Sequence, residues 1–249
     1  MKKQLLNQKN IGIVYAIIFS VIFVSISLFL LKYLNGVTWY IVSSILRLIF
    51  GFAIIIIGKK FFNRKVKEIF SFEKCNKAML CGIGFILYFI YYIILLIVGA
   101  KNITGLTFGL VMSKIIFQQI TTGFYEELNY RFLILDGYFF GKQDIKNRLI
   151  YAFISFIFFG LVHVVTGWDT YNFLLTGVIG VSFAVIYIKS RNIIVPMLLH
   201  FIYDIFANLV QFIEWNNSLL FVNMYSLFEV VITIMFIISL VILVKKDND

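Results

Sequence analysis

Long apolar runs set the limits on how this chain folds. Eight of them, separated by short polar breaks, lie near residues 11–31, 38–57, 78–99, 106–139, 149–165, 171–188, 193–213 and 219–244. Most are close to the roughly 20 residues that a helix needs to cross a bilayer. Only 14% of the 249 residues are charged, against about a quarter in a soluble domain. The sequence therefore predicts an all-α, polytopic transmembrane helical bundle of about eight helices.

The fourth run is too long for one simple span. We expect it to be tilted, broken near Gly123, or extended past the membrane surface. The N-terminal segment MKKQLLNQKN is basic, as in a signal peptide, but the next apolar run is too long and ends in no cleavage site. It is therefore predicted to be a retained first span. No linker separates domains, so we expect a single membrane domain over residues 1–249.

The basic residues predict the topology. Seventeen of them fall on one side of the membrane if the helices simply alternate: Lys2, Lys3, Lys9, Lys59, Lys60, Arg64, Lys65, Lys67, Lys74, Lys77, Lys142, Lys146, Arg148, Lys189, Arg191, Lys245 and Lys246. The other side receives Lys32 and Lys101. Because cytoplasmic loops carry the excess of Lys and Arg, both termini are expected to be cytoplasmic. The basic residues that encode this topology account for the net charge of +10, so no nucleic-acid partner is expected.

Ionisable residues inside the apolar runs are candidates for function. Each costs about 2.5–3.5 kcal/mol at mid-bilayer. The stretch GFYEELNYRFLIL, residues 123–135, holds Glu126, Glu127 and Arg131, and the chain's two histidines, His163 and His200, also lie in apolar runs. Glu127 and Arg131 have the i,i+4 spacing of an ion pair. Glu126 points about 100° away from Glu127 and is free to face another group.

Two more polar facets lie on later helices. His200 and Asp204 are one turn apart, and Asn208 continues the stripe. All such facets must face the bundle interior or a hydrated cavity. They are either interhelical contacts that fix the packing or parts of one site. Two further basic residues, Arg47 and Lys114, also lie inside apolar runs. Each is expected either to extend its charged group to the membrane–water interface or to pair with an acid on a neighbouring helix.

One carboxylate and two imidazoles suit a hydrolase. A Glu deprotonates water, a His positions the proton, and a second His or an amide donor stabilises the oxyanion. An Arg opposes the pKa rise that suits a base, which favours Glu126 as the base and Glu127 as the structural acid. The zincin motif HExxH is absent. Even so, Glu126, His163 and His200 are a possible zinc ligand set if they converge.

The chain resembles the CPBP family, the CAAX proteases and bacteriocin-processing enzymes also called Abi. Its first motif, EExxxR, stands as EELNYR from Glu126 to Arg131. The second, FxxxH, stands as FGLVH from Phe159 to His163, and the third, Hxxx(N/D), as HFIYD from His200 to Asp204. The resemblance covers about residues 110–210, and we place the catalytic core at about 106–213.

The resemblance implies an endopeptidase that works within the membrane. It implies that Glu126 and His163 activate water, that His200 and Asp204 form an oxyanion site, and that Glu127 and Arg131 support them. An Asn at the Asp204 position would donate to an oxyanion, whereas an ionised Asp repels one. Asp204 is therefore expected to be protonated, to orient His200, or to bind a metal. A mechanism without metal is favoured over zinc.

The expected partners are a peptide or small membrane-protein substrate and the lipid bilayer. A multi-pass protein of a bacterial plasma membrane is expected, because the Lys, Ile, Phe and Asn usage is typical of an AT-rich bacterium. Two alternatives stay open. One is a non-catalytic bacteriocin self-immunity factor or membrane scaffold that retains the motifs. The other is an ion-coupled transporter, which the lack of an inverted repeat disfavours.

Overall fold

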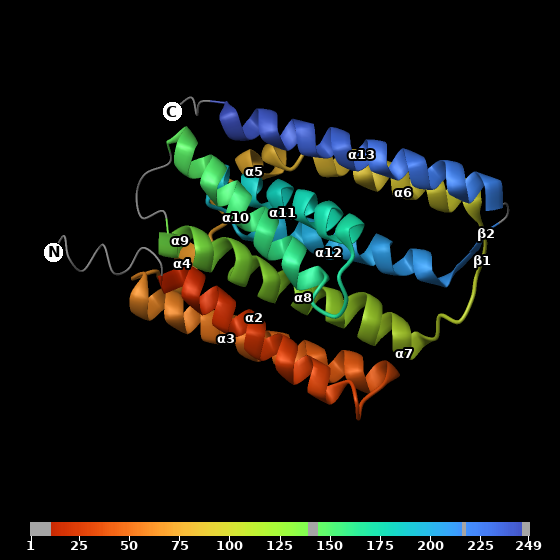
Figure 1. Cartoon of the computed structure of the whole chain (residues 1–249), viewed down its shortest axis with the longest axis horizontal. Coiled ribbons are helices and arrows are strands. Elements are labelled where there is room, and N and C mark those ends of the chain that lie inside the picture. The colour runs from red at the N-terminus through yellow and green to blue at the C-terminus, as the bar shows by residue number, and fades with distance from the viewer. Residues whose placement is uncertain (1–10, 139–143, 216–217, 246–249) are drawn as a thin grey trace.

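The computed structural model describes residues 11–138, 144–215 and 218–245, with side chains described outside 137–138 and 218–225. Among the residues of the topology prediction, Lys2, Lys3, Lys9, Lys142 and Lys246 lie outside these ranges. The long helices of the described residues are α2 (Ile11–Leu30), α3 (Gly36–Phe61), α6 (Gly84–Gly99), α8 (Gln118–Glu127), α10 (Ile145–His163), α11 (Thr170–Ser190), α12 (Ile194–Leu209) and α13 (Ser218–Val244). The short ones are α4 (Val66–Ile69), α5 (Cys75–Cys81), α7 (Phe108–Leu110) and α9 (Ile134–Tyr138). The helices run roughly side by side in one bundle (Figure 1).

The predicted all-α transmembrane class is confirmed. Six helices of the described chain are long and apolar enough to cross a membrane, or seven if α5 and α6, which meet at a 64° bend, form one broken span. The fourth apolar run accounts for a further helical segment. Ile11 and Val244 lie at the same end of the bundle, as an even number of spans requires (Figure 1). That this end is cytoplasmic stays a prediction, because it depends on the charges alone.

The fourth run is one uninterrupted helical segment from Phe108 to Tyr138. Ordinary α-helical turns in α7, α8 and α9 alternate with wider π-helical turns at Val111–Phe117 and Leu128–Leu133. The expected break near Gly123 is wrong, since Gly123 lies within α8. π-helical turns occur often at functional sites. Here the second of them begins directly after Glu127 and carries Arg131.

Gly123 permits a close helix contact instead of a break. A Cβ at this position would lie 3.0 Å from the backbone carbonyl oxygen of Met197 and 3.6 Å from the Cβ of His200. Small residues let membrane helices approach each other closely. Gly123 therefore sets the distance between α8 and α12, the two helices that carry the acids and His200.

Helix α11 forms the centre of the bundle, and 78% of its most apolar stretch is buried within the protein. It packs along α10 through two glycines. A Cβ on Gly177 would meet the ring of Phe156, and one on Gly180 would lie 2.7 Å from the Cβ of Phe159. At the opposite end of the bundle from Ile11, β1 (Ala100–Ile103) pairs antiparallel with β2 (Ile213–Trp215). This short pair was not predicted, because its residues read as polar breaks between apolar runs.

Candidate active site

The two adjacent acids of α8 have different surroundings. Glu127 is fully buried, and its Oε2 lies 3.2 Å from the Nε of Arg131, which is also fully buried. The predicted i,i+4 ion pair is therefore present. The side chain of Glu126 keeps 14% of its surface exposed. Its Oε2 is buried and accepts no hydrogen bond from any described residue, which is unusual for a carboxylate in a folded protein.

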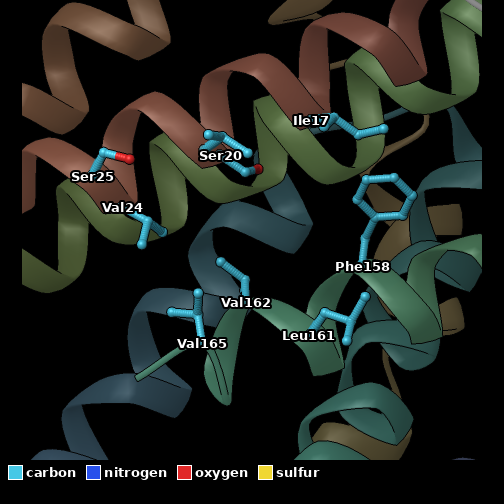
Figure 2. Close-up of a pocket in the computed structure, with 9 residues that line it drawn as sticks. Ile17, Ser20, Val24, Ser25, Phe158, Leu161, Val162 and Val165 are labelled. Atoms are coloured by element: carbon cyan, nitrogen blue, oxygen red, sulfur yellow. The ribbon is translucent and has the colours of Figure 1, made fainter. Parts of the chain in front are cut away.

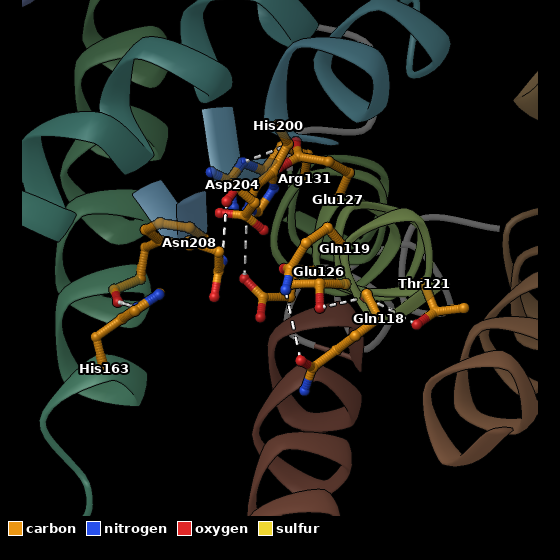
Figure 3. Close-up of polar contacts among 12 residues, drawn as sticks. Gln118, Gln119, Thr121, Glu126, Glu127, Arg131, His163, His200, Asp204 and Asn208 are labelled. Atoms are coloured by element: carbon orange, nitrogen blue, oxygen red, sulfur yellow. Dashed lines mark hydrogen bonds and ion pairs between the residues drawn. The ribbon is translucent and has the colours of Figure 1, made fainter. Parts of the chain in front are cut away.

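Both acids approach the same imidazole from opposite sides (Figure 3). The Nδ1 of His200 donates to Oε1 of Glu127 at 2.9 Å. Its Nε2 lies 3.6 Å from Oδ2 of Asp204 and 3.9 Å from Oε2 of Glu126. The sequence predicted that Asp204 lies beside His200, but it did not predict the hydrogen bond between His200 and Glu127. With carboxylates at both nitrogens, the ring is stabilised as the doubly protonated imidazolium, which donates on both sides.

Arg131 is held by groups from three other helical turns. Its Nη2 donates to the backbone oxygen of Gly180 at 3.3 Å. The guanidinium also lies over the rings of Phe159, 4.5 Å from the centroid, and Phe183, 5.5 Å from the centroid. Cation–π contacts of this kind are strongest where the cation is desolvated. The arginine of the first motif thus fixes Glu127, which in turn fixes the ring of His200.

Phe159 of the second motif connects the three motifs. Besides Arg131, its ring contacts His163 at 4.6 Å and His200 at 5.7 Å between centroids. The sequence predicts Phe159 only as a supporting residue of the site, as it does Asn208. A large buried ring at this position holds the two histidines on either side of it, so its role is to position them.

His163 is separated from the acids (Figure 3). It is the last residue of α10 and is exposed. Its Nδ1 bonds the backbone oxygen of Phe159 at 2.7 Å. A carbonyl only accepts, so Nδ1 carries a proton and donates this bond. Among the described residues no hydrogen bond or ion pair joins His163 to Glu126. The implied water-activating pair stays a prediction.

Asn208 does not extend the site toward the Asp204 carboxylate. Its Nδ2 donates to the backbone oxygen of Asp204 at 2.8 Å, one turn back along α12. The predicted polar stripe is therefore continuous on the helix surface, but its third member satisfies the backbone.

Binding of a zinc ion by Glu126, His163 and His200 stays a prediction. In the part of the chain that the structure describes, no three His, Cys, Asp or Glu side chains are grouped so that they could hold a metal ion. The Nδ1 of His200 is engaged by Glu127, which leaves Nε2 as the ring nitrogen able to bind a metal. The two cysteines, Cys75 and Cys81, are free thiols.

An apolar groove of about 450 Å³ lies beside the site, between α2 and α10 (Figure 2). Leu161 and Val162, which precede His163, line it from α10. On the α2 side Ser20 lines it and pairs with the hydroxyl of Tyr130 at 3.1 Å. Tyr130 interacts electrostatically with Glu126, one turn before it. The groove is thus lined by the helical turn that precedes His163 and by Ser20, which contacts the turn after Glu126 through Tyr130.

An ionic cluster around the buried carboxylate of Asp136 was missed from the sequence. Asp136 accepts from Nε of Arg64 at 2.7 Å and from Nη1 of Arg191 at 2.9 Å. These residues come from three separate segments, and their sequence spacing gives no signal. The cluster links α9, the last turns of the helical segment from Phe108 to Tyr138, to the end of α11 and to the segment after α3.

Comparison with known proteins agrees with this geometry. Residues 107–206 match the family model described as type II CAAX prenyl endopeptidase Rce1-like. This segment is similar to the CAAX-protease family. The match contains all three motifs, so the resemblance to the CPBP family is confirmed. At family level it supports a CAAX-type intramembrane protease, a hydrolase acting on peptides. No curated protein and no solved structure matches the chain.

Proposed function

We propose that the protein is an intramembrane endopeptidase that hydrolyses a peptide bond in a membrane-associated or secreted-peptide precursor. The observation that carries this proposal is the buried, unpartnered Oε2 of Glu126 beside the Nε2 of His200. An acceptor buried without a donor costs about 1–3 kcal/mol. Such a cost is typical of an atom that works on a water or a substrate.

Glu126 acts as the general base that takes a proton from the attacking water. Glu127 stays ionised through its pair with Arg131 and holds His200 by Nδ1. The positive ring then faces the carbonyl oxygen with its Nε2–H, where charge develops as water adds. His163 assists the water from the groove side, as the resemblance implies. Asp204 orients His200 and is not itself an oxyanion donor.

The apolar groove between α2 and α10 accommodates apolar residues of the substrate beside the scissile bond. Its lining comes from residues such as Val24, Phe158 and Val162, which suit a membrane-associated peptide (Figure 2). The protein is then a multi-pass enzyme of a bacterial plasma membrane, with one membrane domain whose catalytic core is residues 106–213.

The test measures hydrolysis directly. Full-length protein is reconstituted into vesicles of phosphatidylethanolamine and phosphatidylglycerol with a pool of synthetic amphipathic peptides in H₂¹⁸O. New carboxyl termini that contain ¹⁸O are detected by mass spectrometry. We expect them with the wild-type protein and not with Glu126→Gln at equal folded amounts. Equal peptide patterns for the two proteins would refute the proposal and leave an immunity factor or scaffold.

A further inference from the structure

Arg47 is a half-buried cation outside the segment that matches the family. It lies in the interior of α3 (Gly36–Phe61), a helix long and apolar enough to cross a membrane. A charged residue at this depth costs about 2.5–3.5 kcal/mol, and such residues usually have a partner or a function. The guanidinium lies over the ring of Phe23, 5.0 Å from the centroid.

Helix α3 holds this cation against the helix of the catalytic acids. One turn after Arg47, a Cβ on Gly51 would overlap the ring of Phe124 in α8. One turn before it, the Oγ of Ser43 accepts from Nε2 of Gln118, at 3.4 Å. Contacts on both sides of Arg47 therefore pack its turn of α3 against α8. The contact residue Phe124 lies two residues before Glu126 in the sequence.

The guanidinium has donors but lacks an acceptor. Its Nε and Nη1 are buried and donate to no described residue. Its charge interacts with the carboxylates of Glu126 and Asp204, yet no described acid lies within the 4.0 Å of an ion pair. Arg131 has Glu127 and the Gly180 carbonyl, whereas no described residue accepts a hydrogen bond from Nε or Nη1 of Arg47.

Asp204 explains why such a donor is needed. A carboxylate at the position of the third-motif partner accepts hydrogen bonds and gives none to an oxyanion. His200 offers only Nε2–H, which two carboxylates already attract. A second donor must come from elsewhere, and Arg47 on α3 is a described cation whose buried Nε and Nη1 have no hydrogen-bond acceptor among the described residues.

We propose that Arg47 is a further catalytic residue, which donates a hydrogen bond to the carbonyl oxygen of the scissile peptide bond. This inference depends on the proposed function. Water oxygen bonds to the carbonyl carbon, its proton passes to Glu126, and the C=O π electrons move onto the oxygen facing Arg47. When the intermediate collapses, the C=O bond re-forms and the C–N bond breaks. The leaving nitrogen then takes the proton from Glu126.

The test compares Arg47→Gln, Arg47→Lys and Arg47→Ala in the vesicle assay, on the peptide that the wild type cleaves fastest. Loss of one oxyanion donor lowers kcat about 10²–10³-fold. We expect this loss for Arg47→Gln with KM little changed, a smaller loss for Arg47→Lys, and recovery of Arg47→Ala with added methylguanidinium. The matched control is Lys114→Met, which removes another cation of the bundle whose Nζ donates to Gln211. Its kcat should stay near the wild-type value.

Each other outcome overturns the inference. If the wild type hydrolyses peptides and Arg47→Gln keeps kcat within about threefold, Arg47 is not a donor, and the proposed function stands. If Arg47→Gln is slow but methylguanidinium restores nothing and thermal stability falls, Arg47 has a packing role. If hydrolysis does not depend on Glu126, the proposed function fails, and the inference fails with it.

Discussion

Substitution of Glu127 separates its structural role from the catalytic role of Glu126. Glu127→Gln keeps the shape of the side chain but leaves Arg131 as a buried cation, and both side chains have no exposed surface. Breaking a buried pair on one side costs about 3–5 kcal/mol. The Gly180 carbonyl and two aromatic rings still stabilise Arg131, which places the expected loss of unfolding free energy near the lower limit, about 3 kcal/mol.

The assay is reversible unfolding of the full-length protein in mixed micelles by titration with sodium dodecyl sulfate, followed by circular dichroism. Arg131→Met should cost a similar amount, and the double variant should cost less than the sum by about 2 kcal/mol. Glu126→Gln is the matched control. Its acid has no ion-pair contact shorter than 3.9 Å, so its unfolding free energy should stay within about 1 kcal/mol of wild type. Additive single variants, or a Glu127→Gln protein as stable as wild type, would refute this reasoning.

Three other predictions concern packing and pH. Gly123→Val should push α8 from α12, because a Cβ already meets the Met197 carbonyl at 3.0 Å. The expected losses are about 1–3 kcal/mol of unfolding free energy and most of the hydrolysis, read by the two assays above. Asp136→Asn should cost about 2 kcal/mol in the micelle titration, because two arginine side chains lose a buried charged acceptor. Hydrogen bonds from Lys101 and Asn102 lower the pKa of the Glu214 carboxyl below its ordinary value. The stability that this adds to the β1–β2 pair is complete above the ordinary pKa of about 4.3 and is lost as pH falls through the lowered value. The protection factors of the amides of residues 213–215, which correct for the intrinsic slowing of exchange in acid, should therefore fall at acidic pH in the wild type and not in Glu214→Gln.

The fold class follows from the sequence because lipid imposes a simple rule. Apolar runs of spanning length must be helical, and their number and order can be predicted from the sequence without knowing how the helices pack. The sequence did not predict the bend between α5 and α6 or the π-helical turns of the fourth run. Both depend on contacts between helices, and periodicity does not report these.

The candidate site was predictable where its contacts are local. The pair of Glu127 and Arg131 is set by helical spacing within one segment. The hydrogen bond that Nδ1 of His200 donates to Glu127 joins residues 73 positions apart, and sequence spacing cannot predict such a contact. The sequence left Arg47 with several possible partners for the same reason, since α3 approaches α8 through long-range contacts such as that of Gly51 with Phe124.

The central claim of this account is that Glu127 and Glu126 approach opposite nitrogens of the His200 ring. The most direct measurement is ¹⁵N NMR of histidine-labelled full-length protein in lipid, with His163→Gln present so that one ring gives the signals. We predict two protonated ring nitrogens, and a shift of Nδ1 alone on Glu127→Gln. One protonated and one bare nitrogen, both unmoved by Glu127→Gln, would contradict the claim.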